Sequence, residues 1–130
     1  MEQAVEAEVG LKAGVGRALD LIAWEIEFAG ARCIKLDSII GEVVDQLPPD
    51  ARERLVEGLH AVDLLAQHLT GISAFTRELS GWVTPDLEVP VAPALAQVTL
   101  GALADRMSTA LGGVERGLND GEDAGDCDLF

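Results

Sequence analysis

A repeat of apolar residues runs through the first half of the chain and ends directly before Pro48 and Pro49. Its members alternate intervals of three and four positions: Leu19, Ile22, Ile26, Ala29, Cys33, Leu36, Ile40, Val43 and Leu47. This spacing is typical of a long helix that packs on a neighbour at a shallow angle. A second row widens the apolar surface in the first half of the repeat: Leu21, Trp24 and Phe28. The repeat therefore predicts a long helix that one partner helix does not fully cover.

The first predicted helix spans residues 3–46, with a kink or break between Gly10 and Gly16. A break is expected there because each glycine in a helix interior costs about 1 kcal/mol relative to alanine. The two prolines then end the helix, since a proline lacks the amide donor and disfavours a helical conformation in the residue before it.

A second helix is predicted over residues 50–79, where Asp50 and Glu53 form the pattern of a capping box. Its apolar stripe again follows helical spacing: Leu55, Leu59, Val62, Ala66, Leu69, Ile72, Thr76 and Leu79. The connection between the two helices is so short that they must be antiparallel neighbours. The first 79 residues thus predict a long helical hairpin.

The remainder of the chain predicts an extended crossing, a third helix and a tail. Residues 81–92 contain two prolines and no helical period, which indicates an extended segment. A third helix is predicted over residues 93–118, opened by Pro93 and capped by Thr99. Residues 119–130 are acidic and contain glycine, so we expect a disordered tail after a helical domain of residues 1–118.

These elements predict an all-α fold, with two ways to cover the hairpin. The third helix can fold back on it to give a three-helix bundle, or two hairpins can pair into a four-helix bundle. The apolar repeat is about 28 residues, or about 42 Å, long. The third helix covers less than half of that length, so we predict the homodimer.

The charge of the chain limits its partners. Nine Lys and Arg against 23 Asp and Glu give a formal net charge of −14, which disfavours nucleic acid and anionic membrane surfaces. We expect partners that are proteins with basic patches. The sequence lacks the basic start and uninterrupted apolar run of a signal peptide, and Cys33 and Cys127 are not placed like a disulfide pair. A reducing, cytoplasmic setting is the expectation.

Asp63 and Gln67 lie four residues apart in the second predicted helix, so their side chains project side by side. This Asp-x-x-x-Gln arrangement resembles the signature of the CheZ family, bacterial chemotaxis phosphatases that hydrolyse the aspartyl phosphate of the response regulator CheY. The small CheZ-related CheT proteins of alphaproteobacterial chemotaxis operons offer a second likeness. Residues Asp126 to Phe130 resemble a shortened form of the acidic C-terminal peptide, ending in apolar residues, with which CheZ proteins dock on the regulator. The order of helix, turn, motif helix, spacer and acidic apolar end covers most of the chain.

The resemblance implies a fold, a partner and roles for particular residues. The fold would be a dimeric four-helix bundle made of hairpins. The partner would be a CheY-like response regulator, with other chemotaxis proteins as further partners. Gln67 and Asp63 would be catalytic, and the tail residues Asp128, Leu129 and Phe130 would bind the regulator.

The chemistry of the Asp63 and Gln67 side chains supports the same function without the family name. Hydrolysis of an acyl phosphate on a receiver domain needs a water held in line, since the receiver supplies its own Mg²⁺ and cation. The Gln67 amide can donate to and accept from such a water, while Asp63 can pair with a lysine of the receiver. Thr70 and Ala74 are small enough to let another protein approach. We expect no cofactor or metal in this chain, and Mg²⁺ on the partner only.

Several other interpretations of the sequence remain open. The pair can be a solvated polar pair on a bundle helix, and the protein can be a non-catalytic adaptor in the chemotaxis pathway. His60 or His68 would suit a histidine phosphotransfer domain, although Asp63 has the wrong charge for a phosphohistidine neighbour. The terminal Asp-Leu-Phe also resembles peptides that bind the replication sliding clamp.

Overall fold

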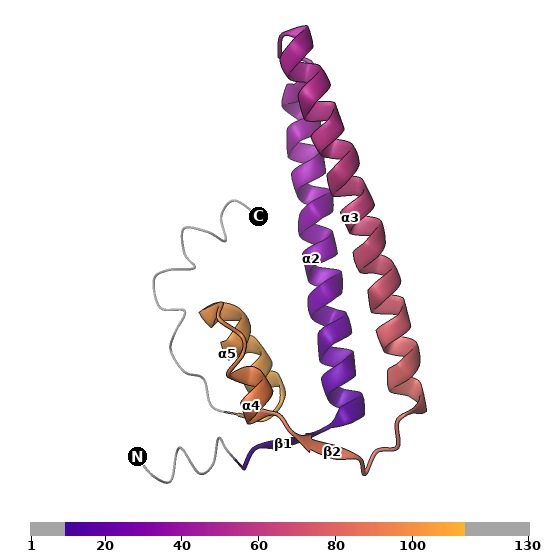
Figure 1. Cartoon of the computed structure of the whole chain (residues 1–130), viewed down its shortest axis with the longest axis vertical. Helices are drawn as coiled ribbons and strands as arrows, with labels where there is room; N and C mark the ends of the chain where they lie inside the picture. Colours follow the sequence, from indigo (N-terminus) through magenta and orange to yellow (C-terminus); the bar gives the residue numbers. More distant parts are fainter. Residues whose placement is uncertain (1–9, 114–130) are drawn as a thin grey trace. The chain divides into compact units, whose positions relative to one another are not determined.

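The computed structural model describes residues 10–113 and is mostly helical (Figure 1). Its elements in chain order are β1 (Lys12–Gly14), α2 (Val15–Val44), α3 (Pro49–Trp82), β2 (Glu88–Pro90), α4 (Ala92–Leu95) and α5 (Gly101–Ala110). The two long helices, α2 and α3, pack together as the expected hairpin. The expectations for residues 3–9, for the end of the third helix and for the tail lie outside the described residues.

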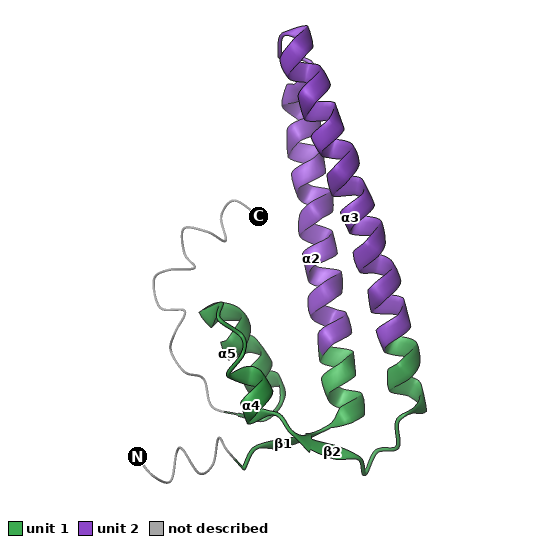
Figure 2. Ribbon diagram, in the orientation of Figure 1, with its two compact units in different colours: residues 1–21, 77–129 green, residues 22–76, 130 purple. Residues whose placement is uncertain are grey.

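The chain divides into two compact units, which Figure 2 colours separately. Residues 22–76 form the hairpin unit. The described residues 10–21 and 77–113 belong to the other unit, which we call the strand unit. Both long helices run through the boundary between the units.

The turn of the hairpin is held by backbone and side-chain hydrogen bonds. Pro49 opens α3, where a missing amide donor costs nothing. The amide of Arg52 donates to the Pro48 carbonyl at 2.8 Å. Its guanidinium donates to the carbonyls of Asp45 at 3.1 Å and Leu47 at 3.2 Å, which satisfies acceptors left over at the end of α2.

Small residues bring α2 and α3 close together inside the hairpin unit. Ala23 and Gly30 are the buried residues of α2, and Ser73 and Thr76 are those of α3. The Ser73 hydroxyl donates to the Ala23 carbonyl at 3.4 Å. A Cβ placed on Gly30 would lie 3.9 Å from the Cβ of Leu69. At these positions the backbones therefore approach without large side chains between them.

This close contact corrects the predicted apolar stripes. The buried and half-buried contact positions are Ala23, Ile26, Gly30, Cys33, Asp37, Ile40 and Val44 on α2, and Leu55, Leu59, Val62, Ala66, Leu69, Ser73 and Thr76 on α3. Ile22, Ala29 and Val43 were predicted to face the partner helix but are exposed. Ile72, predicted in the stripe of the second helix, is 50% exposed and its place is taken by Ser73. Small side chains occupy the most buried contact positions because they allow a shorter distance between the helices.

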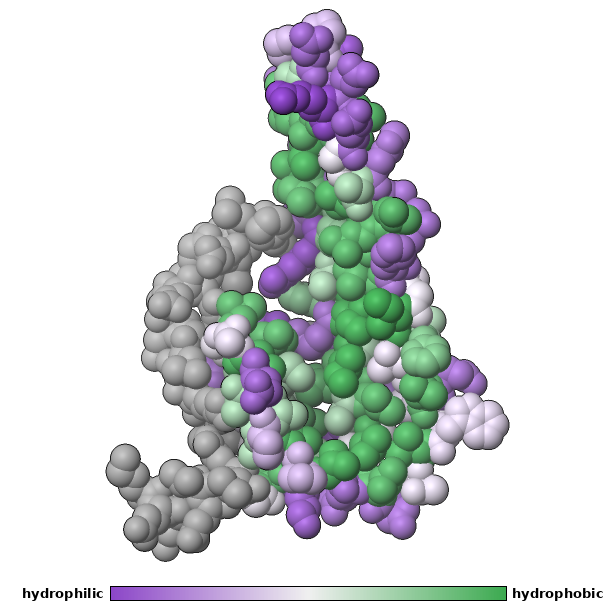
Figure 3. All heavy atoms as spheres, viewed as in Figure 1, coloured by the Kyte–Doolittle hydropathy of each residue, from purple (hydrophilic) through white to green (hydrophobic). Residues whose placement is uncertain are grey.

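The contact positions separate two further faces of the hairpin unit. In two antiparallel helices that face each other, the residue that precedes a contact position turns to the same side in both helices, and the residue that follows it turns to the opposite side. The preceding residues form what we call the apolar face: Ile22, Ala29, Ile39, Val43, Ala61, Leu65, Ile72 and Phe75, together with Arg54, Gly58 and His68. The following residues form what we call the polar face: Trp24, Glu27, Ala31, Ile34, Ser38, Gly41, His60, Asp63, Gln67, Thr70 and Ala74. All of these residues are exposed, and Figure 3 shows hydrophobic side chains gathered along the hairpin.

The strand unit is built on a short antiparallel pair of strands. Strand β1 pairs with β2 so that Ala13 lies opposite Val89. The amide of Val15 donates to the Leu87 carbonyl at 2.8 Å, and the amide of Val91 donates to the Leu11 carbonyl at 3.0 Å. The core of this unit consists of Ala13, Val91, Leu95 and Leu111, with Leu11, Ala18, Leu21 and Met107 packed against it.

Two predicted helices differ from the structure in this unit. Residues 12–14 form a strand and α2 begins only at Val15, because Lys12 to Gly14 pair with β2. The third helix, predicted over residues 93–118, is split into α4 and α5. Leu100 rather than Thr99 occupies the N-cap position of α5, and no side chain caps the helix. Helix α5 ends at Ala110, and Gly112 then takes a φ of 90°, a conformation that favours glycine.

The close approach of α2 and α3 can be tested by changing the size of the contact residues. Gly30→Ala should raise the free energy of unfolding by about 0.5–1 kcal/mol, because the added methyl group meets only ordinary contacts and alanine favours the helix. Ala23→Leu should lower it by about 1–3 kcal/mol, because Ala23 is 0% exposed and a larger side chain must push the helices apart. Urea unfolding followed by circular dichroism at one protein concentration measures both.

Gly41→Ala is the matched control for this prediction, since a Cβ there meets nothing within 4 Å. It should show the gain in helix propensity without any effect of packing. A destabilised Gly30→Ala together with a stabilised Gly41→Ala would contradict the packing described above.

Candidate functional site

Asp63 and Gln67 are brought together on the polar face of α3. Both side chains are exposed, and the Gln67 Nε2 donates a hydrogen bond to the Asp63 Oδ2 at 3.0 Å. Their spacing of four residues on one helix explains the contact, because side chains at this interval stack over each other. The pair predicted from the sequence is therefore an ordered unit at the surface of the protein.

The hydrogen bond orients the Gln67 amide. A carboxylate offers only acceptors, so the amino end of the amide must face Asp63. The carbonyl oxygen Oε1 then points away from Asp63, and Nε2 keeps a second N–H beyond the one it donates. One acceptor and one donor are thus presented from a fixed position, which is the combination that can hold a single water molecule.

Thr70 and Ala74 continue the same face one and two turns further along α3, and both are exposed. The Thr70 hydroxyl donates to the Ala66 carbonyl at 3.0 Å, so its proton is directed back to the helix. On α3 the surface beyond the pair consequently carries short side chains, while Trp24 of α2 is exposed on the same face near the level of Ala74. A partner protein can come close to Gln67 from this side.

The two histidines do not form a joint site. Both are exposed on α3, but His60 follows a contact position and His68 precedes one. They therefore lie on different faces of the hairpin unit. Within residues 10–113, no three His, Cys, Asp or Glu side chains are grouped so that they could hold a metal ion.

The predicted partner-binding residues Asp128, Leu129 and Phe130 lie outside the described residues, as does Cys127. Cys33 is a free, half-buried thiol on α2. None of the helices in the described part of the chain is both long enough and apolar enough to cross a membrane.

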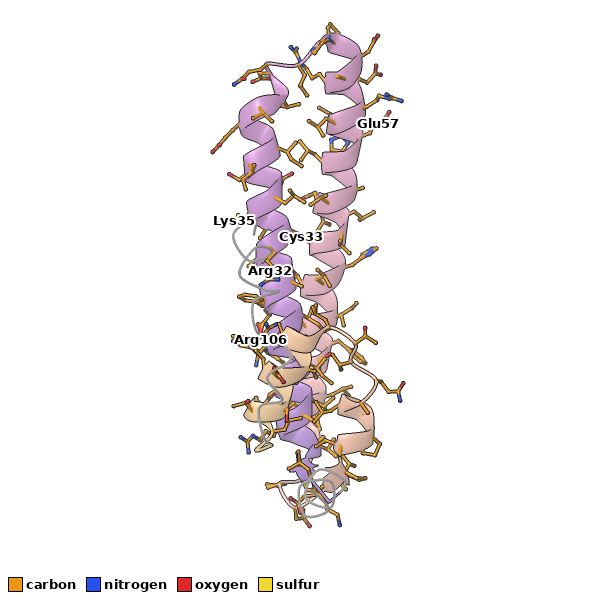
Figure 4. All side chains as sticks on the ribbon, turned by 90° about the vertical axis from the view of Figure 1, so that its left-hand side faces the viewer. Arg32, Cys33, Lys35, Glu57 and Arg106 are labelled. Carbon is orange, nitrogen blue, oxygen red and sulfur yellow. The ribbon has the colours of Figure 1, made fainter. Side chains whose placement is uncertain are left out.

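The sequence analysis did not single out two features of α2 that the structure displays. Trp24 and Phe28 stack with their ring centroids 5.6 Å apart and 10° between the ring planes. The guanidinium of Arg32 lies 4.4 Å from the centre of the Phe28 ring, and its Nε is buried without a hydrogen-bond partner. Figure 4 labels Arg32 on α2. Trp24, Phe28 and Arg32 are spaced by four residues, and this spacing in the sequence could have predicted that the three side chains stack on one another.

The second feature is Ile34, which lies on the polar face and is 65% exposed. It falls between two members of the apolar repeat, Cys33 and Leu36, and does not belong to the repeat itself. Its exposure was therefore predictable from the sequence, but its position beside Asp63 was not.

The fold and the site define a helical-hairpin protein with a surface carboxylate and amide on its second long helix. The chain belongs to a family described as a domain of unknown function, DUF8776, whose model matches residues 14–130. The searches of curated proteins and of solved structures returned no match for the chain.

Proposed function

We propose that this protein binds a CheY-like response regulator and promotes hydrolysis of its aspartyl phosphate. The observation that supports the proposal is the hydrogen bond of 3.0 Å between the Gln67 amide and the Asp63 carboxylate on the exposed surface of α3. It orders the two groups that the reaction needs before any partner arrives. Pre-ordered groups avoid the entropic cost of arranging them during the reaction.

In the proposed reaction, the Gln67 amide holds the attacking water. The water oxygen forms a bond to phosphorus, the bond between phosphorus and the acyl oxygen breaks, and the aspartate of the regulator leaves as a carboxylate. The products are inorganic phosphate and the free regulator. The receiver itself supplies Mg²⁺ and a lysine to stabilise the charge on the phosphoryl group, so this chain needs no cofactor.

Asp63 has two roles in the proposal. Its Oδ2 accepts from Gln67 and fixes the orientation of the amide, while its remaining lone pairs can accept from the lysine of the receiver. This second contact forms in the ground state as well as in the transition state. Asp63 therefore affects both the affinity and the rate.

The tail residues Asp128, Leu129 and Phe130 would provide a second contact with the regulator. Residues 119–130 contain five acidic and no basic residues, so charge favours a basic surface on the partner. A second, tethered contact raises the local concentration of the regulator at Gln67. Because such regulators act in the cytoplasm, the proposal places this chain there too, with other chemotaxis proteins as further partners.

The proposal also includes a homodimer formed through the apolar face. Only small side chains are buried between α2 and α3, while large side chains such as Ile72 and Phe75 are 50% and 65% exposed. A pair of helices with so little buried apolar surface is marginal by itself. A second copy with the same apolar face would cover these residues and give a four-helix bundle. Gln67 lies on the opposite face and would remain open to the regulator.

Light scattering at micromolar concentration should report twice the mass of one chain, and the buried interface should exceed about 2,000 Å² in total. Ile72→Glu should give a monomer, because it places a charge in the middle of the apolar face. Ile34→Glu, on the polar face, is the control that should stay dimeric. A wild-type monomer would rule out the dimer.

Deletion of residues 126–130 should weaken binding of the regulator while the circular dichroism spectrum keeps its helical signal. The expected loss is about tenfold, typical of one lost tethered contact. Fluorescence titration of a labelled receiver measures it. An unchanged affinity would remove the tail from the proposal.

Gln67→Ala should lower the catalysed rate of phosphate release by about 10²-fold, which corresponds to about 2.7 kcal/mol of transition-state stabilisation. Asp63→Ala should lower the rate and also raise the receiver concentration needed for half the maximal rate. Neither change should alter the free energy of unfolding by more than about 0.5 kcal/mol, since the pair is exposed. Phosphate release from phosphorylated receivers of the same cell is the measurement.

The wild-type protein and Gln67→Ala must be compared at the same protein concentration. If the wild type binds a receiver but does not accelerate its dephosphorylation, or if Gln67→Ala is equally fast, the phosphatase proposal fails. The protein is then better described as an adaptor.

A further inference from the structure

Ile34 differs from its neighbours on the polar face of the hairpin unit. The nearest residues of the same face on α2 are Ala31 and Ser38, and those on α3 are polar or small. Ile34 is a large aliphatic residue among them, with 65% of its surface exposed. The other large apolar side chain of this face, Trp24, lies ten residues earlier on α2, about 15 Å along the helix. The other exposed isoleucines of the hairpin unit, Ile22, Ile39 and Ile72, lie on the apolar face.

Ile34 is level with the Asp63 and Gln67 pair along the hairpin. Gly30 faces Leu69, with 3.9 Å between the Cβ atoms once one is placed on Gly30. Since the helices are antiparallel, four residues forward on α2 corresponds to four residues back on α3. Ile34 therefore lies opposite the segment between Asp63 and Gln67. Packed helices have axes about 8–10 Å apart, so the isoleucine and the pair are within reach of one docked protein.

The short side chains around Ile34 make it protrude from the face. A protein that rests on Gln67 must also cover Ile34, because both project to the same side of a closely packed pair of helices. Covering an exposed aliphatic side chain is favourable and does not depend on the state of the phosphoryl group. The contact therefore acts on binding in the ground state and the transition state alike.

We propose that Ile34 is the apolar anchor that docks the receiver domain beside its phosphorylation site. This inference rests on the proposed function, since the receiver is the partner that must reach Gln67. The receiver would offer an apolar recess next to the lysine that pairs with Asp63. A second copy of this chain is the less favoured occupant, because the other large exposed aliphatic residues of the hairpin unit lie elsewhere on its surface and Trp24 is not level with the pair.

The test compares Ile34→Ala with Leu64→Ala, an exposed aliphatic residue of the hairpin unit that lies on neither the polar nor the apolar face. Ile34→Ala should raise the receiver concentration for half the maximal rate about tenfold, equivalent to about 1.4 kcal/mol. The maximal rate should stay within about twofold of the wild type. Leu64→Ala should leave both quantities unchanged. Equal values for Ile34→Ala and the wild type would overturn the proposal.

A binding measurement separates this inference from the catalytic one. Titration calorimetry of the full chain with the same receiver, held in its active form by beryllofluoride, reports affinity without turnover. A tenfold loss with Ile34→Ala supports the anchor even if the wild type shows no phosphatase activity. Absence of binding by the wild type overturns both proposals. A change in dimer mass for Ile34→Ala, with unchanged receiver affinity, would assign Ile34 to contact between copies.

Discussion

The contact of Ala23 and Gly30 with α3 determines which side chains of the hairpin unit are buried and on which face the others are exposed. Small side chains at these positions let the Ser73 hydroxyl reach the Ala23 carbonyl at 3.4 Å. The two helices then share a narrow contact row, and little apolar surface fits inside it. Every larger residue next to the row must turn to one side of the pair or the other. The division into an apolar face and a polar face follows from that contact.

In the proposed function, this division separates two tasks that would otherwise compete for the same surface. Ile72 and Phe75 lie where a second copy can cover them. Gln67 and Asp63 are on the other side, where the hydrogen bond between them is already formed. In the proposed dimer the reaction surface therefore stays accessible, and stability and partner binding can change independently of each other. Ile34 belongs with the second task, because it shares the face of the pair.

Much of the fold was predictable because it depends on local properties of the sequence. The prolines at 48 and 49 and the spacing of apolar residues around them indicated two long antiparallel helices, and both are present. The strand at residues 12–14 was missed, since its hydrogen bonds go to residues 88–90, far away in the sequence. The division of the last helix was missed for a related reason. Leu95 and Leu111 are buried in one core, which favours two short helices over one continuous helix.

The sequence by itself determined that Asp63 and Gln67 would meet, because residues four apart on a helix are neighbours whatever surrounds them. It also determined that there would be two long antiparallel helices, through their apolar spacing and the prolines between them, whereas the start of α2 at Val15 depends on the pairing of β1 with β2. Only the tertiary structure decided which apolar residues would be covered. The spacing of Ile22, Ala29 and Val43 suited a helix contact as well as that of Ala23, Gly30 and Val44 did. The second set was selected because Ala23 and Gly30 are smaller than Ile22 and Ala29 and allow a shorter distance between the backbones, and the first set was left at the surface.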